Sequence, residues 1–143
     1  MTRRGLILAC AAFPLCTALH GDDAQQAWDL FTELAAALSS GNAAQFLSYF
    51  DREMPGYAAL ATDVAALVLQ ADVHSSIELL SNEGNDAART VELDWYLQIV
   101  EQQDAGGSTQ RRERIRCRLV KQRNRWKISA LEPLSFFAPP KVQ

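Results

Sequence analysis

After residue 22, apolar residues first recur at the spacing of an α-helix. Asp22 or Asp23 can cap this helix, and Gly41 offers a natural C-terminal stop. The apolar positions that share one face are Ala24, Ala27, Phe31, Leu34, Ala35 and Leu38. The pattern therefore predicts one long amphipathic helix with its apolar face against a core.

Two further helices are expected before the pattern changes. Asn42 can cap a short second helix, which must end before Pro55-Gly56 because the residue before a proline disfavours helix. A third helix is predicted from about Tyr57 to Leu69. Its apolar positions at helical spacing are Leu60, Val64, Leu67 and Val68. The N-terminal half is therefore helical throughout.

The C-terminal half alternates between apolar and polar residues, which is typical of strands. The inward positions of a first strand, ended by the turn residues 82–86, are Val73, Ser75, Ile77 and Leu79. Those of a long second strand are Val91, Leu93, Trp95, Leu97 and Ile99, with Glu92 and Asp94 on its other face. A turn at Gly106-Gly107-Ser108 leads to a third strand with Ile115, Cys117 and Leu119, and a fourth contains Trp126, Ile128 and Ala130 before Pro133.

The parity of the second and third strands restricts their register, because a slip of one residue would place arginines opposite the apolar face. One register of even parity pairs Trp95 with Cys117, Leu97 with Ile115, Asp94 with Arg118, and Gln98 with Arg114. The basic strand then has an acidic neighbour on its outer face. Glu92 and Asp94 point outward if Trp95 faces the core.

Three helices followed by a curved antiparallel sheet of about four strands is an α+β order that resembles the nuclear transport factor 2-like superfamily. The resemblance rests on the first helix around residues 27–31, the junction 50–57, and the strands ending at residues 125–128. It implies a cystatin-like cone in which the sheet wraps the longest helix. Members of this superfamily include enzymes, transport adaptors and binding modules, so the resemblance implies no single function.

The first 18 residues have the pattern of a cleaved signal peptide: Arg3 and Arg4 precede an apolar run that is too short to span a bilayer. We therefore expect one domain at residues 19–143, exported to a periplasm or secreted, with no membrane span. Cys10 follows Leu8-Ala9 and leaves lipidation there as an alternative.

Charge is unevenly distributed along the chain. The formal net charge of −3 becomes −5 without the two leader arginines, since 12 basic then face 17 acidic residues, which argues against nucleic-acid binding. Residues 111–127 nevertheless carry nine basic residues and one acid. The stripe Arg112, Arg114, Arg116 and Arg118 could bind an anionic partner, but an outer sheet face paired with Glu92 and Asp94 is the favoured interpretation.

Residues for a metal or a nucleophile are scarce beyond the leader. His74 is the only histidine and Cys117 the only thiol after residue 20, so no ligand set for a metal and no catalytic triad is expected, and no cofactor is implied. Asp51 is the weak catalytic candidate, because it follows Tyr49 and Phe50 near the expected mouth of the cone. Its alternative role is that of a turn-forming aspartate before Met54-Pro55.

Three functional hypotheses remain open. The leading one is a non-catalytic domain that binds a small apolar ligand or a protein partner, with a pocket lined by Trp28, Tyr49, Tyr57, Trp95 and Trp126, and with a sheet face that could form a homodimer. The second is an isomerase or cyclase for an apolar carbonyl compound, with Asp51 as base and Tyr49 or Tyr57 as donor. The third is a partner module whose exposed C-terminal anchor is formed by Phe136, Phe137, Pro139 and Pro140.

Overall fold

The computed structural model describes residues 23–102 and 107–140. Its elements, in chain order, are the N-terminal helix (residues 23–39), α2 (Ala43–Ser48), α3 (Tyr57–Gln70), β1 (Ala71–Gly84), β2 (Ala88–Glu101), β3 (Ser108–Gln122), β4 (Arg125–Glu132) and the 3₁₀ helix η1 (Leu134–Phe137). The predicted α+β class is confirmed. The predicted leader, lipidation at Cys10 and the cap at Asp22 lie outside the described residues.

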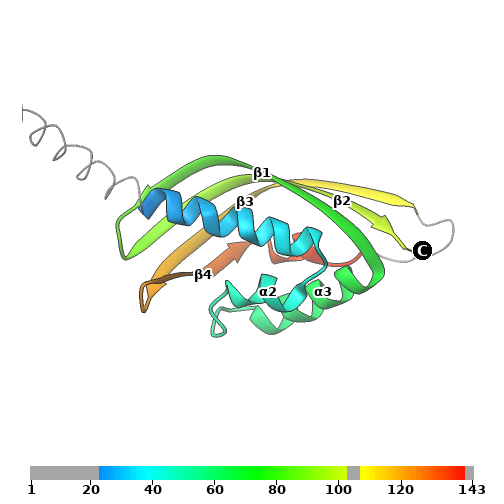
Figure 1. The fold of residues 1–143 in the computed structure, drawn as a ribbon, viewed down its shortest axis with the longest axis horizontal. Helices are drawn as coiled ribbons and strands as arrows, with labels where there is room; N and C mark the ends of the chain where they lie inside the picture. The colour runs from blue at the N-terminus through cyan, green and yellow to red at the C-terminus, as the bar shows by residue number, and fades with distance from the viewer. Residues whose placement is uncertain (1–22, 103–106, 141–143) are drawn as a thin grey trace, which may run out of the picture.

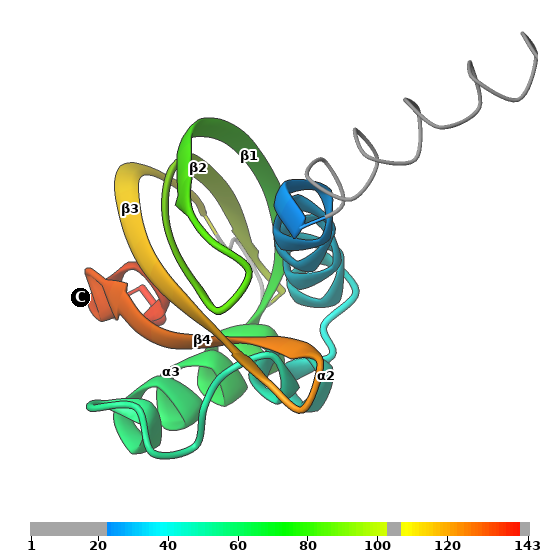
Figure 2. The ribbon, with the colours of Figure 1, turned by 90° about the vertical axis from the view of Figure 1, so that its left-hand side faces the viewer.

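The four strands form one antiparallel meander in the order β1-β2-β3-β4. In Figure 1 the N-terminal helix runs along one side of this sheet, while α2 and α3 lie below it. Figure 2 shows the sheet curling, with the N-terminal helix beside β1 and α2 and α3 beside β4. Among the described residues, no helix is long and apolar enough to cross a membrane.

Glycine and asparagine set the boundaries between the helices. Gly41 has a φ of 75°, a left-handed conformation that suits glycine, and it follows the N-terminal helix as expected. The Asn42 side chain then accepts a hydrogen bond from the Gln45 amide at 3.0 Å, which confirms it as the cap of α2. Gly56, with a φ of 83°, precedes α3.

The predicted register of β2 and β3 is wrong by four residues, although its parity is correct. Trp95 lies opposite Glu113 rather than Cys117, and Leu97 lies opposite Arg111. The strands pair as far as Val100 and Ser108. Alternation determines only which face a side chain occupies, and a shift of four residues preserves that face. The other predicted partners are displaced likewise: Asp94 lies opposite Arg114 and Gln98 opposite Gln110.

Aromatic side chains fill the interior of the cone. Phe137 of η1 lies at the centre, with its ring centroid 5.1 Å from Trp95, 5.3 Å from Phe46 and 5.2 Å from Phe136. Phe136 is 3% exposed and Phe137 is fully buried, so the expectation of an exposed C-terminal anchor is wrong for these two residues. Burial of large apolar rings stabilises the fold strongly enough to hold η1 inside.

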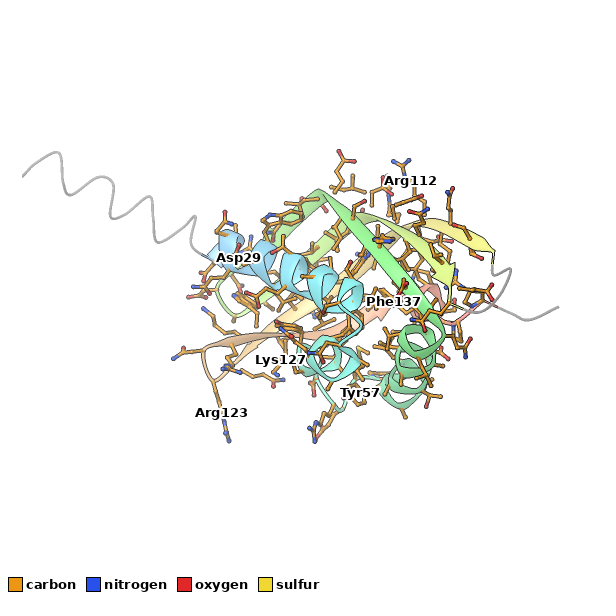
Figure 3. The ribbon with its side chains drawn as sticks, turned by 45° about the vertical axis from the view of Figure 1, so that its right-hand side comes forward. Asp29, Tyr57, Arg112, Arg123, Lys127 and Phe137 are labelled. Carbon is orange, nitrogen blue, oxygen red and sulfur yellow. The ribbon has the colours of Figure 1, made fainter. Side chains whose placement is uncertain are left out.

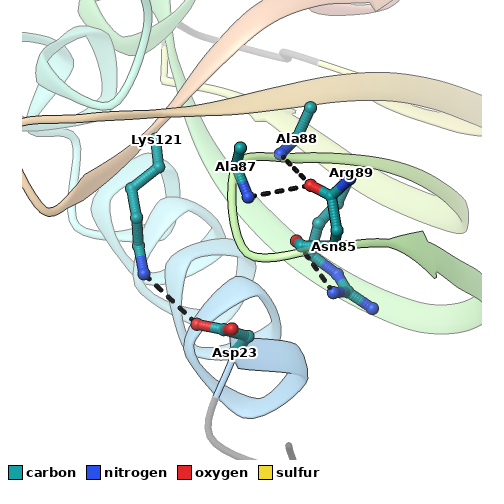
Figure 4. A network of polar contacts seen from close by, with 6 residues as sticks. All are labelled: Asp23, Asn85, Ala87, Ala88, Arg89 and Lys121. Atoms are coloured by element: carbon teal, nitrogen blue, oxygen red, sulfur yellow. Dashed lines mark hydrogen bonds and ion pairs between the residues drawn. The ribbon is translucent and has the colours of Figure 1, made fainter.

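Polar contacts hold the periphery of the cone together. Arg111 Nη1 donates to the Phe136 carbonyl at 2.7 Å, which ties η1 to β3. Figure 4 shows Lys121 paired with Asp23 at 3.2 Å, so the N-terminal helix is joined to the end of β3. In the turn between β1 and β2, Asn85 Oδ1 accepts from the amides of Ala87 and Ala88 at 2.8 and 2.9 Å.

The outer face of the sheet carries the arginine stripe. Arg112 Nη2 lies 2.6 Å from Asp94 Oδ2, and the guanidinium holds the pKa of that carboxyl below its usual range. Glu92 lies opposite Arg116 in the register. These contacts confirm that the basic strand has acidic neighbours and that Asp94 faces away from the core.

Candidate functional site

A cleft of about 440 Å³ opens at the mouth of the cone, between the N-terminal helix, α2 and the start of β4. We call it the helix–β4 cleft. Its lining residues are Gln26, Asp29, Leu30, Glu33, Gln45, Ser48, Tyr49, Asn124, Arg125, Trp126 and Lys127. The size is within the range of small-molecule sites, and most of the lining residues have polar or charged side chains.

Tyr49 joins the two helices that border this cleft. Its hydroxyl donates to Glu33 Oε1 at 2.8 Å and accepts from Gln45 Nε2 at 3.4 Å. Burial raises the pKa of the Tyr49 hydroxyl, and the Glu33 carboxylate that accepts its proton adds to the rise. Tyr49 therefore remains a neutral hydrogen-bond donor at physiological pH.

Trp126 provides the one buried side-chain nitrogen or oxygen without a hydrogen-bond partner in the described part of the chain. The side chain is 7% exposed and lines the cleft, and its indole Nε1 has no hydrogen-bond acceptor. The Lys121 ammonium lies 5.2 Å from the ring centroid. An unsatisfied buried donor costs about 1–3 kcal/mol, so an acceptor supplied by a ligand would recover free energy.

The two walls of the helix–β4 cleft carry opposite charges. Asp29 and Glu33 lie one turn apart on the exposed side of the N-terminal helix, and Arg125 and Lys127 flank Trp126 on β4. The ion pairs among the described residues are Arg112 with Asp94 and Lys121 with Asp23, and neither crosses this cleft. The charged walls therefore stay available to a bound molecule.

Lys127 separates this cleft from a second one of about 580 Å³. Its ammonium donates to the Ser48 carbonyl at 2.6 Å, and both residues line both clefts. The second cleft lies beside α2 and the start of α3, where Asp51 and Tyr57 line it. In Figure 3, Lys127 and Tyr57 lie on the same side of the molecule, whereas Arg123 extends away from it.

Asp51 is held in a local turn. Its Oδ1 accepts from the Glu53 amide at 3.0 Å and its Oδ2 from Gln122 Nε2 at 3.2 Å. Its own amide donates to the Ile128 carbonyl at 2.9 Å, next to a short parallel bridge between Phe50 and Ile128. The carboxylate is half-exposed at the open second cleft and does not enter the aromatic interior.

The five aromatic residues predicted to share a pocket lie in three different places. Tyr49 and Trp126 line the helix–β4 cleft, and Tyr57 lines the second cleft. Trp95 is fully buried and its Nε1 donates to Ser75 Oγ at 2.7 Å. Trp28 packs half-buried against the core. The cleft therefore shares Leu30 and Trp126 with the buried core, whereas Trp95 belongs to the core and lines neither cleft.

The remaining sequence candidates lie on the sheet. His74 is exposed on β1, and Cys117 is buried on β3, where burial strongly raises the pKa of its thiol. No group of three or more potential metal ligands occurs within residues 23–102 and 107–140.

Sequence reasoning missed the charged walls of the cleft. Asp29 and Glu33 share the exposed helix face four residues apart, and this spacing was the available signal. Arg125 and Lys127 were counted only as part of the basic segment. Their position beside the N-terminal helix follows from the curl of β4, which the sequence pattern does not encode.

Comparison with known proteins identifies the fold and no more. No protein-family model and no curated protein sequence matches the chain. A conserved protein from Planctomyces limnophilus DSM 3776 is similar, with a TM-score of 0.71 and 7% identity over 78% of this chain and 94% of its own. A hexachlorocyclohexane dehydrochlorinase (LinA, type 2) has a TM-score of 0.61 and 12% identity over 75% of this chain and 80% of its own.

A third similar structure carries the name of the fold. Its name includes NTF2, for nuclear transport factor 2, and it matches with a TM-score of 0.55 and 18% identity over 73% of this chain and 93% of its own. At such identities the likeness shows the fold alone. Together with the order of three helices and a curled four-stranded meander, it shows that the chain has the nuclear transport factor 2-like fold.

Proposed function

We infer that the protein is a non-catalytic binding domain whose ligand is a small molecule held in the helix–β4 cleft. The observation that carries this proposal is that Trp126, whose buried Nε1 has no partner, lines an open cleft of about 440 Å³. Buried polar groups in folded proteins are almost always hydrogen-bonded, and those that are not call for an explanation. A ligand that accepts this proton supplies one.

The packing of the interior supports the mouth of the cone, rather than its centre, as the binding site. Trp95, Phe46 and Phe137 are each less than 2% exposed, and the Phe137 ring contacts the other two. Among the described residues, no polar or charged residue is buried in this core. An apolar ligand inside the cone, as the sequence suggested, would have to displace these rings.

The alternative of an isomerase or cyclase is less well supported. One similar structure is named as a dehydrochlorinase, so the fold can hold an enzyme. A carboxylate base in this fold needs access to a substrate carbonyl in a water-poor site. Asp51 instead accepts two hydrogen bonds within a turn and lines an open cleft.

The alternative of a protein-interaction domain would use the outer sheet face, including a homodimer formed through it. The Arg112–Asp94 pair and the placement of Glu92 opposite Arg116 show that acidic groups already neighbour the stripe. This arrangement favours a solvated face. We therefore rank interaction through this face below ligand binding in the cleft.

A nuclear magnetic resonance screen of the full chain against small polar molecules tests the proposal. We expect ligands to shift the backbone amide signals of Asp29, Tyr49 and Trp126 together, because these residues line one cleft. Shifts confined to the outer face around Arg114 would favour an interaction domain instead. If no compound shifts the cleft amides, the proposed function is wrong.

A further inference from the structure

The charges of the helix–β4 cleft narrow the chemistry of its ligand, provided that the proposed function is correct. Its basic wall is formed by Arg125 and Lys127, the two neighbours of Trp126 on β4. Arg125 is exposed and takes part in none of the ion pairs found among the described residues. The Lys127 ammonium donates one of its three protons to Ser48.

These donors favour an anionic group. A carboxylate has two acceptor oxygens, so it could accept from the Trp126 indole and also pair with the Arg125 guanidinium. Such charge-assisted hydrogen bonds are stronger than neutral ones. The indole Nε1 is covered in the present conformation, so a ligand oxygen can reach it only if the ring moves.

The opposite wall favours a cationic group. Glu33 accepts the Tyr49 proton with Oε1, and Asp29 accepts from Gln25 Nε2 with Oδ1 at 2.9 Å. These contacts use one oxygen of each carboxylate, and the second oxygen can accept from a further donor. Two carboxylates one helical turn apart repel each other, and an ammonium between them would remove that repulsion.

We propose that the helix–β4 cleft binds a small zwitterion of the size of an amino acid or a short peptide. Its carboxylate lies against Trp126 and Arg125, and its ammonium lies against Asp29 and Glu33. A molecule with only one charge leaves one wall without a counter-charge. An apolar molecule leaves the charges of both walls unmatched while desolvating them.

Four dipeptide derivatives test the two ends separately. The probes are glycylglycine, N-acetylglycylglycine, glycylglycinamide and N-acetylglycylglycinamide, and the signal is the Trp126 indole resonance of the full chain, assigned with Trp126→Phe. Glycylglycine should bind most tightly. Blocking either charged end should weaken binding about tenfold, because each block removes one charge-assisted contact.

Two variants assign each end of the ligand to one wall. Arg125→Gln should weaken the binding of glycylglycine about tenfold. The affinity for glycylglycinamide should change by less than about twofold, because this derivative has no carboxylate to pair with Arg125. Asp29→Asn should weaken the binding of glycylglycine and leave the affinity for N-acetylglycylglycine unchanged, because the acetylated derivative has no ammonium. Arg123→Gln is the matched control, because Arg123 lies in the turn just before Arg125 but does not line the cleft, and the affinities of the derivatives should not change.

The outcomes separate this inference from the proposed function. If the four derivatives bind equally, or if none binds while another small molecule shifts the cleft amides, the proposal of a zwitterionic ligand is wrong. The proposed binding function of the cleft is then unaffected. If Arg125→Gln weakens all four derivatives alike, the carboxylate contact is wrong. If no molecule of any class shifts the cleft amides, both proposals fail.

Discussion

Removing the Phe137 ring tests whether the C-terminal 3₁₀ helix is part of the core. The side chain is fully buried and its ring contacts those of Phe46, Trp95 and Phe136 at centroid distances of 5.1–5.3 Å. Truncation of a buried phenylalanine to alanine typically costs about 3–5 kcal/mol. This is a large share of the roughly 5–15 kcal/mol that stabilises a domain.

Urea denaturation followed by tryptophan fluorescence measures this cost. With an m-value of about 1.5 kcal/mol per molar urea, a loss of about 4 kcal/mol lowers the midpoint of Phe137→Ala by about 2–3 M. Leu69→Ala is the control, because Leu69 is 78% exposed and its change should stay within about 0.5 kcal/mol. Phe137→Leu provides a milder variant if the alanine variant does not fold. A loss below about 1 kcal/mol in Phe137→Ala would refute the packed position of η1.

Three further predictions concern single positions. Gly56→Ala should destabilise the protein more than Gly41→Ala. Both positions have a left-handed φ, but only at Gly56 would the new Cβ collide with the Leu134 side chain. Thermal denaturation compares the two variants, and equal losses of stability would count against the contact. The Cys117 thiol should react with a thiol reagent only after unfolding, because burial raises its pKa; fast labelling of the native protein would contradict this. The Asp94 carboxyl should titrate below its usual range because of Arg112, so its contribution to stability is present above the unfolded pKa and is lost as pH falls through the folded one. Arg112→Gln should raise the pKa of Asp94, followed by nuclear magnetic resonance, toward the ordinary value, and an unchanged titration would argue against the pair.

The succession of elements could be predicted from the sequence because each depends on local pattern. The alternation from Val91 to Ile99 predicts a strand, and Asn42 predicts a helix start, and both are confirmed. The register of β2 and β3 could not be predicted, because alternation gives parity only. The turn predicted at Gly106-Gly107-Ser108 lies partly outside the described residues, and the strands pair as far as Val100 and Ser108.

The candidate site was harder to predict because it depends on the curl of the sheet. Tyr49 and Trp126 were singled out from the sequence, and both line one cleft. Trp95 was grouped with them because inward-facing positions of a cone can belong to the core or to a pocket. Trp95 belongs to the core because Phe136 and Phe137 of η1 fill the interior around it. The sequence around these two phenylalanines does not indicate that they fold back into the cone.

The indole signals of Trp126 and Trp95 provide the most direct test of the central claim that ligands bind at the mouth of the cone. Trp126 lines the helix–β4 cleft with its Nε1 unpartnered, while Trp95 Nε1 is bonded to Ser75 in the interior. When a ligand from the screen is titrated into the full chain, the Trp126 Nε1–H resonance should move downfield to saturation while that of Trp95 stays in place. A shift of Trp95 with Trp126 unchanged would place the ligand inside the cone and contradict the account.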